Sequence, residues 1–177
     1  MSRIPRLKWR AGAWGLPPPL PGLRQFSAML GVVVLSRIAW LPTIAVQPGQ
    51  TPIFNWLLWG YGVPALAFWT GAMTLRRRGD ALASRSVESA AITFTGLAVM
   101  LQIRHVMNDG DIYRPSASLA EIGLQVSTLL AMTIGLDHVR TRTGNVVHDV
   151  AARVLGALAF LGALISLGIH FNPVVTG

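Results

Sequence analysis

The side chains that could do chemistry in this chain lie mainly at the ends of long apolar segments. Arg104 closes one apolar run, Glu121 and Gln125 open the next, and the polar turn 108–111 joins the two runs. Glu121 and Gln125 are four residues apart, so they share one face of a helix. A glutamate inside a membrane requires a cationic or hydrogen-bonding partner. Arg104, on the adjacent helix, is the nearest candidate for that partner, and Arg37 is the other.

Seven polar residues from four predicted helices would collect towards one side of the membrane and form a candidate polar pocket. In a functional interpretation the arginines position an anionic ligand, and Glu121 with His105 handles protons. In a structural interpretation, which we favour, the same groups form an ion pair and reach the lipid headgroups from helix ends. The set comprises Arg37, Asn55, Gln102, Arg104, His105, Glu121 and Gln125.

No motif assigns a catalytic, cofactor-binding or metal-binding residue. The chain has no phosphate-binding glycine loop, no G-x-S-x-G and no H-E-x-x-H. Cysteine is absent, which excludes disulfides and thiolate metal sites. The pairs Asp137-His138 and His148-Asp149 flank one polar loop, but their spacing is not diagnostic of a metal site. Whether the protein is an enzyme stays open, with the balance against it, and we expect no cofactor.

Composition places the chain among membrane proteins. Of its 177 residues, 52% are hydrophobic and only 12% are charged, whereas soluble domains have about 25% charged residues. The net charge of +8 could suggest nucleic acid, but the basic residues lie between apolar runs, as in the positive-inside pattern of membrane proteins. We therefore expect a lipid environment and no nucleic-acid partner.

The apolar runs predict an all-α, polytopic transmembrane helical bundle of five spans. Each run has about 20 residues, the length that crosses about 30 Å of hydrocarbon. A basic, proline-rich cytoplasmic tail, residues 1–25, precedes the transmembrane domain, residues 26–177. Glu88 is expected in the first turn of the third span, where negative charge suits the helix dipole. The predicted spans are 26–46, 53–75, 86–107, 117–136 and 150–171.

Basic residues alternate between the loops and so predict the orientation. Five lie in the tail, four between residues 75 and 86, and three between residues 137 and 153, out of fifteen in the chain. The intervening loops hold only Arg104 and Arg114. Because basic loops stay in the cytoplasm, the N-terminus is predicted inside and the C-terminus outside.

Five short segments together resemble a known family. They are Phe54-Asn55-Trp56-Leu57-Leu58, Tyr61-Gly62-Val63-Pro64-Ala65, Ile103-Arg104-His105, Glu121-Ile122-Gly123-Leu124-Gln125 and Phe171-Asn172-Pro173. The chain from Phe26 onwards is similar to the bacterial multi-pass membrane proteins called domain of unknown function 2339. Members are typically much longer, so the resemblance implies a short or truncated member. It carries over no activity.

Three functions follow as hypotheses for a multi-pass protein of the bacterial inner membrane. The first is a structural or interaction component of the cell envelope, whose partners are lipid and other membrane polypeptides or a second copy. In the fifth span Gly156, Ala159 and Ala163 fall close to one face, as do Gly162 and Ser166. Such spacing permits close helix contacts, and it agrees equally well with the general abundance of small residues in membrane helices. The second is a transporter or lipid-handling protein with an outward-facing polar pocket. An envelope enzyme acting on a lipid-linked sugar ranks last.

Overall fold

The computed structural model describes residues 49–77, 79, 81–115, 117–166, 168 and 171, all within the unit Gln47–Gly177. These residues form helices joined by turns, and the described ranges contain no strand. The predicted all-α class is therefore confirmed for this part of the chain. The tail 1–25, the first predicted span and Arg37 lie outside the described residues.

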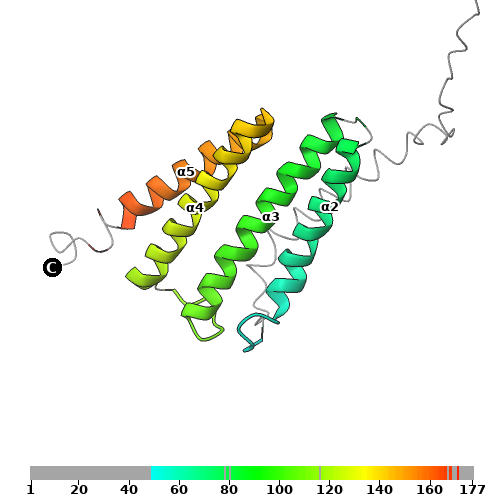
Figure 1. The fold of residues 1–177 in the computed structure, drawn as a ribbon. Coiled ribbons are helices and arrows are strands. Elements are labelled where there is room, and N and C mark those ends of the chain that lie inside the picture. The colour runs from blue at the N-terminus through cyan, green and yellow to red at the C-terminus, as the bar shows by residue number, and fades with distance from the viewer. Residues whose placement is uncertain are drawn as a thin grey trace, which may run out of the picture. The chain divides into compact units, whose positions relative to one another are not determined.

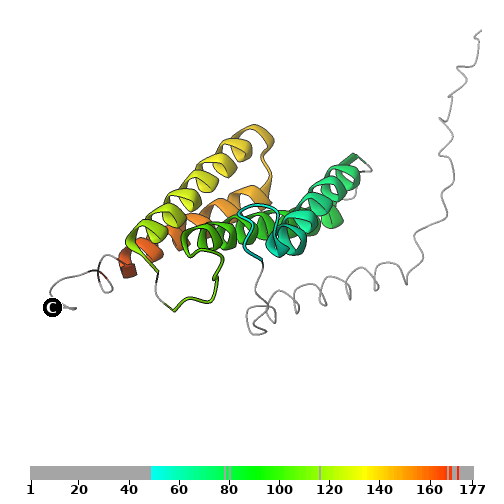
Figure 2. The same ribbon diagram turned by 90° about the horizontal axis from the view of Figure 1, so that it is seen from below.

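Four α-helices and one π-helical turn make up the described part. Helices α2 and α3 run side by side, and so do α4 and α5 (Figures 1 and 2). Helix α3 also contacts α4 and α5, which joins the two helical hairpins. In chain order the elements are η2 (Leu58–Gly62), α2 (Val63–Arg77), α3 (Ala81–Met107), α4 (Leu119–Thr143) and α5 (Val146–Ile165).

The turn between α4 and α5 occupies only two residues, because each one caps a helix. Gly144 adopts a left-handed conformation, with φ of 63°, and its N–H donates to the Arg140 carbonyl. This conformation favours glycine, which lacks a Cβ. Asn145 then caps α5, since its side chain accepts a hydrogen bond from the Val147 N–H. So short a connection makes α4 and α5 antiparallel neighbours.

A π-helical turn, η2, ends two residues before Pro64. Proline lacks an N–H, and its ring collides with the carbonyl four residues earlier in a regular helix. The chain widens instead, and the Val63 N–H donates to the Leu58 carbonyl five residues back. One wide turn thereby accommodates the proline, and η2 continues into α2 without interruption.

Aromatic and small side chains hold α2 against α3. Phe94 is buried, and its ring centroid lies 6.3 Å from that of Tyr61 and 5.2 Å from that of Phe68. The Trp69 indole N–H donates to the Thr95 hydroxyl across the same interface at 3.1 Å. This hydrogen bond gives the indole a partner where lipid offers none.

Small residues bring α4 and α5 together, as their spacing along the sequence predicted. A Cβ at Gly156 would lie 3.4 Å from Thr133 Cγ2, and one at Gly162 would lie 3.7 Å from Val126 Cγ2. Ala159, between them on α5, has no exposed surface. The small-residue face of α5 is therefore used for packing within the chain.

Three helices in the described part are long and apolar enough to cross a membrane, namely α3, α4 and α5. Their ends differ from the predicted spans. Helix α3 begins at Ala81, earlier than the predicted residue 86, so Glu88 lies inside the helix and not in its first turn. The prediction for Glu88 is wrong because hydropathy marks the apolar part of a helix and not its start. Likewise α4 runs beyond residue 136, to Thr143, and α5 begins before residue 150, at Val146.

Substituting Ala159 with leucine should destabilise the α4–α5 pair, because three added carbons have no space at a fully buried position. Overpacking of this kind costs about 1–3 kcal/mol. Ala157→Leu is the matched control, since Ala157 is exposed on the same helix. Unfolding of the purified protein in a denaturing-detergent titration measures both. Equal effects of the two substitutions would contradict the packing described here.

Candidate functional site

Glu121 is the centre of a polar network between α3 and α4. The residue has 0% of its surface exposed. Its carboxylate accepts hydrogen bonds from Arg104 Nη1 at 2.7 Å, Asn108 Nδ2 at 2.9 Å and Gln125 Nε2 at 3.3 Å. The ion pair that the sequence predicted between Glu121 and Arg104 is thus present. Three donors to one carboxylate compensate for removing it from water.

The first turn of α4 places Glu121 where α3 can reach it. Ser118 is the N-cap, and its side-chain oxygen accepts from the Glu121 N–H at 3.1 Å. A serine followed three residues later by glutamate is the capping-box sequence, in which the glutamate usually folds back on the cap. Here the carboxylate contacts α3 instead. The cap therefore fixes the start of α4, and the side chain is left to join two helices.

Arg104 stabilises the loop between α3 and α4 through hydrogen bonds to its backbone. Besides its ion pair with Glu121, its Nε donates to the Ile112 carbonyl at 2.7 Å, and its Nη2 donates to the Arg114 carbonyl. A guanidinium has five N–H donors in a planar arrangement that suits several acceptors at once. The Arg104 guanidinium therefore forms its ion pair and hydrogen bonds with groups of its own chain.

A second network joins the start of the described chain to the end of α3. Asn55 Oδ1 accepts from the Leu57 and Leu58 N–H groups, and Nδ2 donates to Gln102 Oε1 at 3.3 Å. The same Nδ2 lies 3.4 Å from His105 Nδ1. The Gln102 amide donates to the Pro52 carbonyl. Asn55 thus caps a helix and connects it to α3.

The partners of His105 favour one tautomer of its ring. Nε2 lies 2.7 Å from the Gly49 carbonyl oxygen, which can only accept. Nδ1 faces the Asn55 amide nitrogen, which can only donate. The tautomer that carries its proton on Nε2 satisfies both contacts. This arrangement gives His105 a structural task, joining the segment before η2 to α3.

Comparison with known proteins gives one match. The model of the family described as "Predicted membrane protein (DUF2339)" matches residues 7–177. The chain belongs to this family. No curated protein and no solved structure matches the chain.

Six of the seven predicted pocket residues of this DUF2339 protein are described, and they divide into two networks. Arg104, Glu121 and Gln125 lie in one, and Asn55, Gln102 and His105 lie in the other. Arg37 lies outside the described residues. Sequence reasoning missed the buried Asn108, which donates to the Arg104 carbonyl and to Glu121. An asparagine in a turn directly after an apolar run is the signal that could have indicated it.

A third polar group lies at the other end of the helices and was not expected. Glu88 is buried, and its carboxylate contacts Arg76 Nη2 at 2.6 Å, Asn145 Nδ2 at 2.7 Å and His148 Nε2 at 3.3 Å. These partners come from α2, the α4–α5 turn and α5. The expected start of α3 concealed this group, since Glu88 was assigned to a helix end.

Loss of Arg104 should strongly destabilise this DUF2339 protein. Arg104→Ala leaves a fully buried carboxylate without its cation and frees the α3–α4 loop. Breaking one side of a buried ion pair costs about 3–5 kcal/mol.

Arg114→Ala removes the same charge from an exposed position on the same loop and should change stability by about 0.5 kcal/mol or less. The free energy of unfolding in detergent measures both variants. A small loss for Arg104→Ala would mean that the Glu121 carboxylate has adequate partners without it.

Proposed function

We propose that the protein is a structural or interaction component of the bacterial cell envelope, a bundle that packs with lipid and with other membrane polypeptides or a second copy. The observation that carries this proposal is the way Glu121 and Arg104 are bonded within the chain. The two side chains form an ion pair with each other, and both form hydrogen bonds with neighbouring groups of the chain. Groups used in this way fix helix positions and leave little charge for a ligand.

The proposal includes five spans in the inner membrane, with the N-terminus inside and the C-terminus outside. Helices α3, α4 and α5 have the required length and composition. Elements η2 and α2 are consecutive and together have 20 residues, from Leu58 to Arg77, which is about 30 Å of helix. The fifth is the apolar run 26–46, which rests on the sequence.

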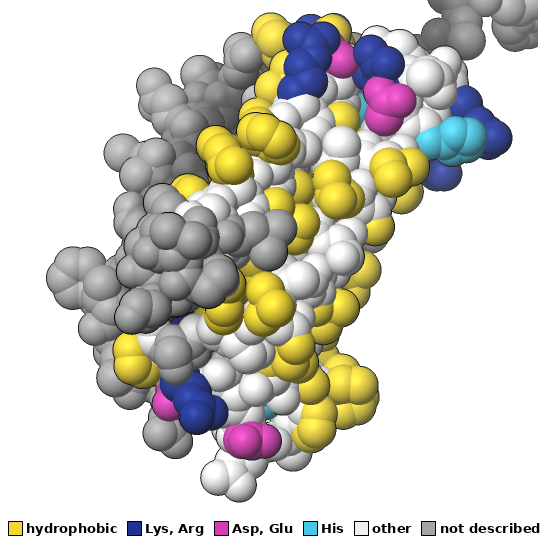
Figure 3. Space-filling view, turned by 90° about the vertical axis from the view of Figure 1, so that its left-hand side faces the viewer, with side chains coloured by type: hydrophobic (Ala, Val, Ile, Leu, Met, Phe, Trp, Pro, Cys, Tyr) yellow, Lys and Arg dark blue, Asp and Glu magenta, His cyan; other side chains and the backbone are white. Residues whose placement is uncertain are grey.

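The surface agrees with a membrane environment. Figure 3 shows hydrophobic side chains over the middle of one face, and the charged side chains and histidines gathered towards its two ends. Large apolar side chains are exposed on all four α-helices of the described part, including Leu66 on α2, Ile134 on α4 and Phe160 on α5. Such side chains face lipid or a second polypeptide in a membrane.

A lipid-handling or transport role is the second candidate. A cavity of about 400 Å³ lies beside the second network, and Gln102 lines it together with apolar residues that include Leu57, Ile103 and Leu124. An apolar cavity with one polar group is of the kind that takes an acyl chain.

The topology predicts opposite accessibility for two loops. The chain has no cysteine, so Pro115→Cys and Arg142→Cys each introduce one thiol at an exposed loop or helix-end position. A membrane-impermeant maleimide applied to intact spheroplasts should label the thiol at position 115. The thiol at position 142 should react only after permeabilisation. The reverse pattern, or labelling of both from outside, would contradict the proposed orientation.

The interaction proposal predicts an uneven environment around the bundle. Leu66→Cys, Ile134→Cys and Phe160→Cys alter positions of matched exposure, 66%, 69% and 67%. Each thiol is given a photoreactive maleimide and illuminated in native membranes. A protein partner covers one face, so we expect a specific protein adduct from one or two positions and not from all three.

Native mass spectrometry after gentle extraction provides the matching test of composition. A retained polypeptide or second copy is the expected result. A monomer, combined with no protein adduct at any of the three positions, would overturn the interaction proposal.

A further inference from the structure

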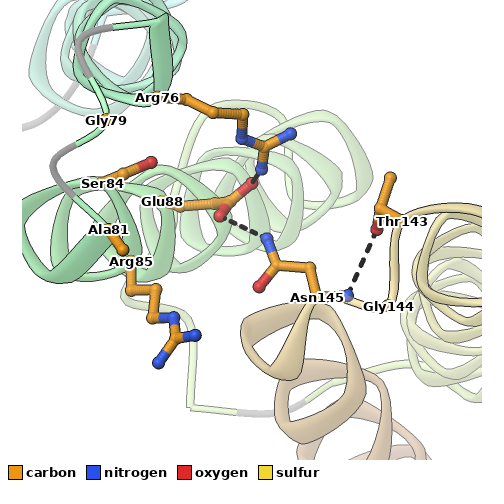
Figure 4. A pocket seen from close by; sticks show the side chains of 9 residues that line it. All are labelled: Arg76, Gly79, Ala81, Ser84, Arg85, Glu88, Thr143, Gly144 and Asn145. Atoms are coloured by element: carbon orange, nitrogen blue, oxygen red, sulfur yellow. Dashed lines mark hydrogen bonds and ion pairs between the residues drawn. The ribbon is translucent and has the colours of Figure 1, made fainter.

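A polar cavity lies where the α2–α3 turn meets the α4–α5 turn. Its volume is about 340 Å³, and Figure 4 shows the side chains that line it. Arg76 and Glu88 line it and are joined by a hydrogen bond, and the Asn145 amide donates to Glu88 from the opposite hairpin (Figure 4). Because both turns follow or precede apolar helices, this cavity sits at a membrane–water boundary under the proposed topology.

An apolar groove continues from the polar cavity along the helices. Its volume is about 460 Å³, and Arg76 and Glu88 line both spaces. The groove runs between α2 and α4, and its walls are mainly hydrophobic. The wall residues include Trp69, Met73, Met132, Gly135, Leu136 and Val139. A charged end followed by an apolar channel is the shape and polarity of one amphipathic molecule.

The polar end carries one arginine, Arg85, that no carboxylate of the described residues neutralises. Arg85 is exposed and lines the cavity, and its side chain has no ion pair or hydrogen bond with any described residue. In Figure 4 it extends away from the Arg76–Glu88 pair. The side chain of Arg76 is 52% exposed, with one nitrogen on Glu88. Because Arg76 neutralises Glu88, an arriving anion meets the net positive charge of Arg85 and the exposed nitrogens of Arg76.

A buried ring nitrogen supplies an independent indication. His148 lines the apolar groove and is buried, and its Nε2 contacts Glu88 at 3.3 Å. Its Nδ1 is also buried and has no hydrogen-bond partner within the described part of the chain. Buried polar atoms are normally paired, so this unpaired nitrogen is an unusual polar feature next to the groove.

We propose that these two spaces form one binding site for an anionic glycerophospholipid. The phosphate lies against Arg85 and Arg76, and an acyl chain occupies the groove between α2 and α4. This site is separate from the Glu121 network, and it stands without the proposed interaction role.

The test is native mass spectrometry of the purified chain titrated with phosphatidylglycerol or with phosphatidylcholine of the same acyl chains. We expect the anionic lipid to bind more tightly. Arg85→Ala should weaken phosphatidylglycerol binding by about tenfold, the value of one charge-assisted contact. Arg142→Ala is the matched control, because it removes the same charge from an exposed position in the last turn of α4, outside the lining of both spaces. It should change the affinity by about twofold or less.

A second variant tests the groove. A Cβ at Gly135 would meet nothing within 4 Å, so Gly135→Leu should fold and occupy groove volume. We expect it to weaken binding of phosphatidylglycerol by about tenfold, and the unfolding midpoint should match that of the parent. Glycerol phosphate without acyl chains distinguishes a lipid site from a free-anion site, and it should not displace the lipid at equal concentration.

Three results for the lipids and the variants would each overturn the proposal. They are equal affinity for the two lipids, equal losses for Arg85→Ala and Arg142→Ala, and unchanged lipid binding in Gly135→Leu. Displacement of the lipid by glycerol phosphate would likewise overturn it, in favour of a site for the headgroup anion alone.

Discussion

The described structure depends on supplying donors to carboxylates that are removed from water. Lipid offers no hydrogen bonds, so a buried charge must be neutralised by the chain itself. Glu121 receives donors from α3, from the turn after α3 and from its own helix. Meeting this requirement fixes where α4 begins relative to the end of α3, and Arg104 orders the connecting loop as a consequence.

The same constraint acts at both ends of the helices, with different outcomes. Around Glu121, the donors of Arg104 and the oxygens of the carboxylate are matched within the chain. Around Glu88, the carboxylate is matched, but Arg85 and His148 Nδ1 remain without partners among the described residues. A matched network holds helices in place, whereas unmatched groups beside a cavity leave room for a ligand. This contrast separates the proposed structural role of one end from the lipid site inferred at the other.

Between these ends, packing relies on small and aromatic side chains. Ala159 and its glycine neighbours let α5 approach α4, and Phe94 fills the space between α2 and α3. Helices in lipid gain little from hydrophobic association, so close backbone approach and good contact must supply the attraction. The π-helical turn before Pro64 likewise limits the loss of hydrogen bonds in lipid. It retains a backbone hydrogen bond, from Val63 to Leu58, close to the point where the proline removes one.

Hydropathy and charge placement in the sequence predicted the helical class and the membrane environment, and they made Arg104 the nearest candidate partner of Glu121, because these depend on local composition and on a short loop. Capping residues Ser118, Gly144 and Asn145 likewise act through neighbouring backbone groups. Only the tertiary structure brought Glu88 together with Asn145 and His148, which lie far along the chain from it, Asn145 by 57 residues. Their contact depends on how the two hairpins pack, and packing of apolar helices in lipid leaves no periodic signal from which that pairing could be read.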